Sequence, residues 1–308
     1  MKNLKLARLL VFISTLLPKR YRIRLNSSQF SEPFFIFGSG RNGSTLLNVI
    51  LNQHSKLFMP SEQYFLGISI IKYQLYNYIL WRDLVKIIYG ELIDQAENHS
   101  WNFSPNEIIN EAFNFEDSKR SMETLVHHIY SSYARLTKRN STTWGDSTPY
   151  NTRYINEIYS CFPKAKYIFL IRDGRDVIAA YKKGGTDVFD DLANPAIAAS
   201  HWIKSIKKYH WIKKRTDVHV VKYEELVKDT ETTLRGILTF LGQEYQPTLS
   251  DFYKNVPKVS EYKQNHHKNL KKPINTSSIG QWKELLTQEE KELLVPKLTP
   301  YLQQFNYL

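Results

Sequence analysis

A glycine-rich turn near the N-terminus carries the residue types that bind phosphate. The apolar run Phe34–Phe37 predicts a buried strand, and the period of Ser44–Gln53 predicts a helix. Between them, residues 38–45 read Gly-Ser-Gly-Arg-Asn-Gly-Ser-Thr. Turn amides and a helix N-terminus converge on one anion in such an arrangement, so the sequence predicts a phosphate-binding loop.

The spacing of this loop resembles a Walker A loop, with one difference. Ser44 stands where the Walker A loop has the lysine that reaches the γ-phosphate of a nucleoside triphosphate. A P-loop kinase or NTPase is therefore an alternative interpretation, and Mg²⁺-dependent turnover of ATP would support it.

A second anion signal follows the apolar run at residues 166–171. Arg172 and Arg175 stand at the end of this predicted strand, where ligands of α/β proteins bind. Both guanidinium groups can fork onto a phosphate; the alternative is that they form salt bridges with Asp173 and Asp176. Two anion sites at strand ends imply a ligand with two separated phosphates.

Strands that alternate with helices are expected to position these residues. A third apolar run, at residues 218–222, follows a long helical segment at Pro195–Lys214. We expect an α/β fold, P-loop-like and three-layered, in which helices flank a central parallel sheet of about four or five strands. The expected domains are a basic amphipathic segment at 1–30 and one α/β domain at 31–308, with an aromatic-rich, helical or irregular insertion at about 64–120.

The composition limits the classes of function. The chain has 308 residues, of which 42% are hydrophobic, and a net charge of +12 that predicts an anionic partner. Nucleic acid is not the expected partner, because no recognition motif accompanies the lysines of residues 204–214. The single cysteine, Cys161, excludes an intramolecular disulfide and a Cys/His zinc cluster, and it gives no sign of an oxidising compartment.

The N-terminal segment is basic and partly apolar. Its first 25 residues include seven Lys and Arg residues and no acid. The apolar stretch Leu9–Leu17 is too short to cross a bilayer, which takes roughly 20 residues. We expect a basic amphipathic helix at a membrane surface or on the protein, with a signal peptide or a short signal anchor as alternatives. The expected localisation is cytoplasmic with peripheral membrane contact, and a Golgi-type signal anchor is the alternative.

Four motifs resemble, in order, those of the sulfotransferases that use 3′-phosphoadenylyl sulfate (PAPS). Residues 40–46 resemble the P-R-S-G-T-T-L loop of that family, and residues 171–177 resemble its 3′-phosphate motif. Residues 220–226 are similar to the R-Y-E-D-L segment, and residues 280–286 to the late G-x-W-K segment. The most similar branch includes tyrosylprotein and carbohydrate sulfotransferases. The resemblance implies a metal-independent transferase that moves a sulfuryl group from PAPS to an acceptor hydroxyl.

The resemblance also implies a role for individual residues. Arg41 stands where the family has a catalytic arginine or lysine, which neutralises charge on the bridging oxygen as the sulfur–oxygen bond breaks. Arg172 matches the residue that binds the 3′-phosphate. The residues that the resemblance places on the donor are Arg41, Asn42, Gly43, Ser44, Thr45, Arg172, Tyr223, Lys271 and Lys272.

Glu62 is the candidate general base. It lies one loop beyond the helix that follows the phosphate loop, and a catalytic glutamate of the tyrosylprotein branch stands at the same spacing. In an in-line displacement the acceptor hydroxyl loses a proton as it attacks, and a carboxylate within hydrogen-bond reach can take it. The alternative is a glutamate at a helix N-terminus, placed after Ser61 by helix electrostatics.

Several positions depart from the family pattern, among them Ala180 and Ser147. Ala180 stands where the family usually has a serine ligand of the 3′-phosphate, for which Arg175 or Lys182 could compensate, and Ser147 stands where it often has a lysine. These departures leave a non-catalytic anion-binding module as a further alternative, which would bind the nucleotide product without turnover. The expected acceptor is a carbohydrate or glycolipid, with peptidyl tyrosine as the alternative class.

Overall fold

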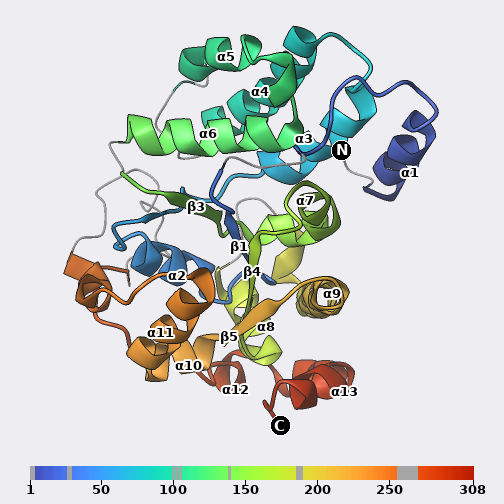
Figure 1. The fold of residues 1–308 in the computed structure, drawn as a ribbon. Coiled ribbons are helices and arrows are strands. Elements are labelled where there is room, and N and C mark those ends of the chain that lie inside the picture. Colours follow the sequence, from blue (N-terminus) through green and yellow to red (C-terminus); the bar gives the residue numbers. More distant parts are fainter. Residues whose placement is uncertain are drawn as a thin grey trace. The chain divides into compact units, whose positions relative to one another are not determined.

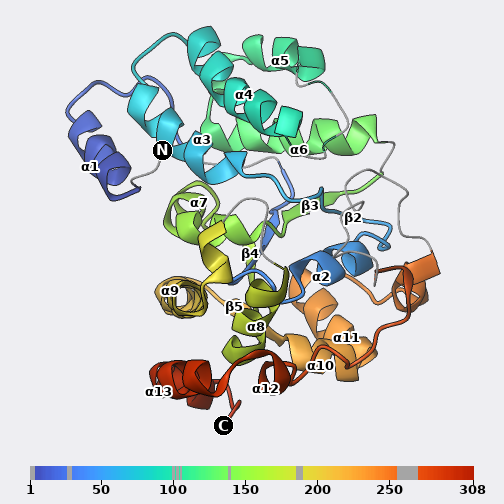
Figure 2. The ribbon, with the colours of Figure 1, turned by 180° about the vertical axis from the view of Figure 1, so that it is seen from behind.

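A single parallel sheet organises the strands of the chain. The computed structural model describes residues 4–25, 30–98, 101, 104, 106–137, 140–184, 190–254 and 270–308. Its five strands follow the order β2-β3-β1-β4-β5, and helices occupy most of the chain between them (Figures 1 and 2). This confirms the predicted α/β fold with a parallel sheet of about four or five strands.

The chain divides into two compact units, which we describe separately. Unit 1 comprises Met1–Phe34 and Ser55–Ala165, and unit 2 comprises Phe35–His54 and Lys166–Leu308. The expected organisation into a segment at 1–30 and one domain at 31–308 stays a prediction.

Unit 1 is mainly helical. Its short strands β2 and β3 pair in parallel, with Leu57 opposite Thr143 and Phe58 opposite Trp144. Its helices and strands are α1 (Leu4–Ser14), β2 (Leu57–Phe58), α3 (Phe65–Tyr76), α4 (Trp81–Asn98), α5 (Asn106–Phe113), α6 (Met122–Leu136), β3 (Thr143–Asp146) and α7 (Ile155–Cys161).

Aromatic side chains fill the core of unit 1. Tyr130 of α6 stacks on Trp144 with ring centroids 4.1 Å apart, and Trp101 stacks on Tyr133 at 4.4 Å. All four side chains are buried. Stacked pairs of this kind add to the stabilisation that comes from burial alone. Trp101, which belongs to the expected insertion at 64–120, therefore serves as a core residue.

Unit 2 holds the long parallel pair β4 and β5. Tyr167 lies opposite Val218 and Ile171 opposite Lys222, and all residues of β4 after Lys166 are buried. The elements of this unit are β1 (Phe34–Phe37), which begins on the last residue of the first segment of unit 1, α2 (Ser44–Leu51), β4 (Lys166–Ile171), α8 (Gly174–Gly184), α9 (Pro195–Lys213), β5 (Val218–Lys222), α10 (Tyr223–Lys228), α11 (Thr230–Leu241), α12 (Trp282–Leu285) and α13 (Gln288–Gln304).

Strand β3 occupies part of a segment that its composition suggests is a turn. Residues 144–149 read Trp-Gly-Asp-Ser-Thr-Pro, yet Trp144–Asp146 complete β3. Gly145 is required here by a close approach, because a Cβ atom at this position would overlap the ring of Phe34. Glycine within a strand often marks such a contact rather than a turn.

Among the helices of the described residues, none is both long enough and apolar enough to cross a bilayer.

A buried histidine should make unit 1 sensitive to acid. His127 accepts a hydrogen bond from the Trp144 indole at 2.9 Å through Nδ1, and burial lowers its pKa to about 4. As the pH falls below about 6.5, the unfolded chain takes up a proton that the folded one refuses, so stability is lost. We expect the unfolding free energy of the wild type to fall by about 2 kcal/mol more than that of His127→Gln when the pH is lowered from about 7 to 4.5. Urea unfolding of both proteins at the two pH values measures this difference, and equal losses would contradict it.

Candidate functional site

The predicted phosphate loop lies in unit 2, between β1 and α2. Three of its residues adopt left-handed backbone conformations: Gly40 with φ 73°, Arg41 with φ 49° and Gly43 with φ 96°. Left-handed residues in such a turn draw successive backbone N–H groups into a concave anion-binding arrangement. Helix α2 starts directly after it at Ser44, with Gly43 as its N-cap. The local backbone thus has the geometry that the sequence predicts for an anion site.

The side chain of Asn42 ties this loop to the sheet. It is 1% exposed, and its Nδ2 donates a hydrogen bond of 2.6 Å to the carbonyl oxygen of Leu170 in β4. Tyr181 of α8 holds the loop from another side, because its hydroxyl donates to the carbonyl oxygen of Ser39 at 2.6 Å. Asn42 therefore has a structural role, and any part it takes in binding a donor would fall to its backbone amide.

Gly43 is held by two constraints at once. Its φ of 96° is unfavourable for any residue with a Cβ atom, and a Cβ here would lie 2.5 Å from Cδ2 of Tyr223. Gly242, the C-cap of α11, has a similar φ of 70°, but no atom of the described residues lies within 4 Å of the corresponding Cβ position.

Replacing each of these two glycines by alanine should have different effects, and Gly242 serves as the control for Gly43. We expect Gly242→Ala to lower the unfolding free energy by about 1 kcal/mol, the cost of a left-handed alanine. Gly43→Ala should cost more and should also abolish binding of a phosphate ligand, because the loop must move to admit the new methyl group. Urea unfolding and calorimetry with adenosine 3′,5′-bisphosphate measure both effects, and equal behaviour of the two variants would contradict the assignment of the loop.

Arg41 points its side chain toward α8. Its guanidinium carbon lies 5.9 Å from the centroid of the Tyr181 ring, and one of its terminal nitrogens comes within 3.5 Å of the position that a Cβ atom on Gly184 would take. The guanidinium group is thus placed beside the loop and partly exposed, as a residue that meets a bound anion must be.

Arg172 joins the strand-end motif to the phosphate loop. Its Nη1 donates to the carbonyl oxygen of Arg41 at 3.0 Å, and its Nη2 donates to the carbonyl oxygen of Ser278. The guanidinium lies over the ring of Tyr223, 4.7 Å from its centroid. Its Nε is buried and has no hydrogen-bond partner among the described residues. A guanidinium has five N–H groups, so this buried cation keeps donors for a further acceptor.

Arg175 is already engaged, which removes it from the expected phosphate ligands. It makes a bidentate salt bridge to Asp173, at 2.7 Å for Nη2, and Nη2 also donates to the carbonyl oxygen of Tyr307 at 3.0 Å. The alternative salt-bridge interpretation is therefore correct for Arg175, although the pair is buried rather than superficial. Lys182 is likewise paired, with Glu290 at 2.7 Å, so neither residue stands ready to replace the serine missing at Ala180.

Asp176 brings the late motif onto the strand-end motif. Its carboxylate accepts hydrogen bonds from the backbone N–H of Gly280 at 2.7 Å and of Trp282 at 2.9 Å. Lys271 and Lys272 belong to the same C-terminal stretch and are exposed. All four motifs noted in the sequence thus lie within unit 2, and Tyr223 and Arg172 connect three of them.

Glu62 belongs to unit 1 and lies before α3. This helix begins at Phe65 with Tyr64 as its N-cap, so Glu62 is outside its first turn and the helix-terminus explanation for this residue is wrong. Both neighbours are fixed through their backbones: Trp101 Nε1 donates to the Ser61 carbonyl oxygen at 3.1 Å, and the Gln63 N–H donates to the Thr148 hydroxyl at 3.1 Å. The loop therefore holds Glu62 in a defined place while leaving its side chain partly exposed.

A buried carboxyl group supports this loop, and its role was not predicted from the sequence. Asp146 accepts hydrogen bonds from the Tyr130 hydroxyl, from the Thr148 N–H at 2.8 Å and from Asn151 Nδ2 at 3.0 Å. Burial raises the pKa of Asp146, and the three donors act against that rise. Asp146 fixes Thr148, which in turn holds Gln63. The Gly145–Pro149 motif was the available signal, but it gave no indication of these partners.

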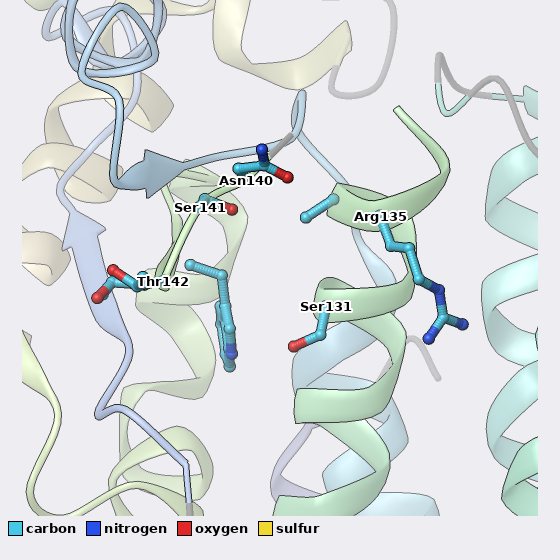
Figure 3. A pocket seen from close by; sticks show the side chains of 8 residues that line it. Ser131, Arg135, Asn140, Ser141 and Thr142 are labelled. Atoms are coloured by element: carbon cyan, nitrogen blue, oxygen red, sulfur yellow. The ribbon is translucent and has the colours of Figure 1, made fainter. Parts of the chain in front are cut away.

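Unit 1 also contains an open cavity of about 370 Å³ at the end of α6 (Figure 3). Arg135 lines it, but its guanidinium extends away and pairs with Glu111 at 3.0 Å. None of the predicted site residues contributes to its wall, which consists of Ser131, Ala134, Arg135, Asn140, Ser141, Thr142, Thr143 and Trp144. The cavity therefore shares no residue with the predicted site.

A sequence model of the sulfotransferase family matches residues 33–247, which include the phosphate loop, Arg172 and Tyr223. The chain belongs to the sulfotransferase family. The match confirms the family that the motifs resemble, and three of the four motifs lie within the matched residues.

Two relatives match most of this chain, although the sequence identity is low. A putative protein-tyrosine sulfotransferase of Caenorhabditis briggsae is 20% identical over 285 residues, which cover 91% of this chain and 90% of that protein. An uncharacterized protein of Aquifex aeolicus is 24% identical over 304 residues, and these cover 91% of this chain but 35% of that protein. The chain therefore spans about a third of the length of the Aquifex relative.

Among solved structures, the sulfotransferase domain of the Synechococcus PCC 7002 olefin synthase shares the fold. The TM-score is 0.57 at 20% identity, and the match covers 91% of this chain and 98% of that domain. At this level of identity the likeness shows the fold alone.

Proposed function

We propose that this sulfotransferase takes its sulfuryl group from PAPS and transfers it to a hydroxyl group. The observation that carries the proposal is the hydrogen bond from Arg172 Nη1 to the Arg41 carbonyl oxygen, which links the two predicted anion-binding elements of unit 2. PAPS carries a 5′-phosphosulfate and a 3′-phosphate, and two linked sites suit a ligand of that kind. The Nε of Arg172 is buried and has no hydrogen-bond partner among the described residues, so an acceptor oxygen of the same ligand could satisfy it.

Each end of the donor has its own proposed residues. The amides of Gly43, Ser44 and Thr45, with the two hydroxyls, would hold the 5′-phosphosulfate. Arg172 would bind the 3′-phosphate through charge-assisted hydrogen bonds, with Tyr223 against the nucleotide. Lys271 and Lys272 are exposed and would add positive charge near the donor.

Two side chains would carry the chemistry. The donor supplies an activated sulfuryl group with adenosine 3′,5′-bisphosphate as the leaving group. Glu62 would accept the proton of the acceptor hydroxyl, so that the oxygen can attack sulfur. Arg41 would neutralise the charge that grows on the bridging oxygen as the sulfur–oxygen bond breaks. Among the described residues, no group of three His, Cys, Asp or Glu side chains is arranged to hold a metal ion, and a metal-independent reaction stays a prediction.

A carbohydrate or glycolipid is the first proposed acceptor. Peptidyl tyrosine is the second proposed acceptor, because the Caenorhabditis relative is described as a putative protein-tyrosine sulfotransferase. We propose a cytoplasmic location with peripheral membrane contact, since a chain with the single cysteine Cys161 has no intramolecular disulfide of the kind that is common in oxidising compartments.

Transfer from sulfur-labelled PAPS tests the proposal and identifies the acceptor. The purified chain is incubated with labelled donor and with separate lipid, glycan and tyrosine-peptide pools, and products are identified by mass spectrometry. A sulfated hydroxyl in one pool supports the proposal. Binding of the nucleotide product without transfer to any pool would favour a non-catalytic anion-binding module, and Mg²⁺-dependent ATP turnover would favour a kinase or NTPase.

A further inference from the structure

Helix α1 turns its large apolar side chains outward. Its buried residues are the small Ala7 and Ser14, whereas Phe12 is 72% exposed and Leu16, just after the helix, is 85% exposed. We define the α1 face as the exposed apolar residues of this segment, which are Leu6, Leu9, Leu10, Phe12, Ile13, Leu16 and Leu17. A contiguous apolar surface of this kind on a folded protein marks an interaction site.

Specific contacts hold the helix in this orientation. Arg8 makes a bidentate salt bridge to Glu157 of α7, with Nε 2.6 Å and Nη2 2.9 Å from the carboxylate oxygens. The Ser14 hydroxyl reaches the Gln74 carbonyl oxygen of α3 at 3.3 Å, and Lys19 Nζ donates to the same oxygen at 2.6 Å. The polar side of the segment is therefore bound to α3 and α7, and the exposed side chains of the α1 face point away from these contacts.

Positive charge surrounds the α1 face. Lys5, Lys19 and Arg20 are exposed, and the sequence contains no acid before Glu32. The carboxylate that contacts this helix, Glu157, is neutralised by Arg8. A surface that combines apolar side chains with exposed cations complements an anionic phospholipid bilayer.

Exposed aromatic residues lie beside the same segment. The Arg20 N–H donates to the Asn77 carbonyl oxygen at 2.9 Å, which places residues 76–80 next to the end of the α1 segment. Within that stretch Tyr76, Tyr78 and Leu80 are exposed. Tyrosines favour the boundary between hydrocarbon and headgroups, where one end of the ring is apolar and the other is wet.

We propose that the α1 face docks on the surface of a bilayer that contains anionic phospholipids. The 11 residues of α1 extend about 16 Å at 1.5 Å per residue, roughly half of the hydrocarbon thickness, so the helix would lie in the plane of the interface. This docking rests on the peripheral membrane contact proposed above and assigns it to one surface and one class of lipid, and it does not depend on the identity of the donor or acceptor.

Vesicle flotation with the full chain tests this docking. Vesicles of neutral phosphatidylcholine are compared with vesicles that contain about one-third phosphatidylserine, at low and high salt. We expect at least about tenfold stronger binding to the anionic vesicles, weakened by salt, and a loss of about tenfold or more in the double variant Phe12→Ser, Leu16→Ser.

Leu293→Ser is the matched control, because Leu293 is 54% exposed on α13 in the other unit. It should bind vesicles like the wild type, and circular dichroism should show both variants folded. Equal binding to both vesicle types, or unchanged binding of the double variant, would overturn the proposal. A third outcome would also overturn it: the wild type does not bind vesicles, and light scattering shows that it forms a dimer whereas the double variant does not. That outcome would assign the α1 face to contact with a second copy of the chain.

Discussion

Replacement of Glu62 by glutamine is expected to lower turnover by roughly 10²–10⁴-fold while leaving the affinity for adenosine 3′,5′-bisphosphate unchanged. The amide keeps the size of the side chain but cannot accept the proton of the acceptor hydroxyl. The backbone of this loop is fixed from the Ser61 and Gln63 sides by Trp101 and Thr148, so the substitution should not move it. Steady-state transfer rates and product calorimetry measure the two quantities.

The acidity of the acceptor separates a base from a merely structural residue. A phenol loses its proton more readily than an aliphatic alcohol, so the defect of Glu62→Gln should be smaller with a phenolic acceptor. The exposed Glu107, in the first turn of α5, offers a control in Glu107→Gln, which should behave like the wild type. A Glu62→Gln enzyme with normal turnover would remove Glu62 as the base, and an equal defect with both acceptors would assign it a structural role.

Arg172→Ala is expected to weaken binding of adenosine 3′,5′-bisphosphate by roughly 100-fold. The proposed contact uses charge-assisted hydrogen bonds, and the loss of two of them costs about 3 kcal/mol. AMP lacks the 3′-phosphate, so its affinity should change little. Titration calorimetry with both ligands gives the two dissociation constants directly.

The buried position of Arg172 makes controls necessary for this experiment. Its hydrogen bonds to the carbonyl oxygens of Arg41 and Ser278 also stabilise the unit, so Arg172→Lys and urea unfolding accompany the alanine variant. Arg215→Ala removes one exposed positive charge from the same unit and should leave both affinities unchanged. Equal weakening for AMP and the bisphosphate would show that Arg172 acts on the fold rather than on the 3′-phosphate.

Much of the fold could be predicted because its strands are buried apolar runs. Phe34–Phe37, Lys166–Ile171 and Val218–Lys222 form strands within the predicted bounds, and Gly242 ends α11 in a left-handed conformation as its position suggests. Such runs have few alternatives once turns and helices flank them. Strand β2 has only two residues, Leu57 and Phe58, and β3 contains a glycine, so neither carries a periodic signal.

The identity of the site residues was more predictable than their partners. The phosphate loop and the arginines could be identified from their spacing, because the turn and the charges that an anion site needs come from residues that are close together in the sequence. Arg175, by contrast, binds the backbone of Tyr307, which lies 132 residues further along the chain, and the Tyr307 hydroxyl binds Glu224 at 2.8 Å. No local pattern encodes such pairs, which are set by the packing of α13 and the residues after it within unit 2.

Comparative calorimetry of adenosine 3′,5′-bisphosphate and AMP on the purified wild-type chain tests the central claim most directly. Two linked anion sites should make the bisphosphate bind at least roughly tenfold more tightly than AMP, because the second phosphate adds charge-assisted hydrogen bonds. A bisphosphate that does not bind, or that binds no better than AMP, would contradict the proposed donor and the site built for it.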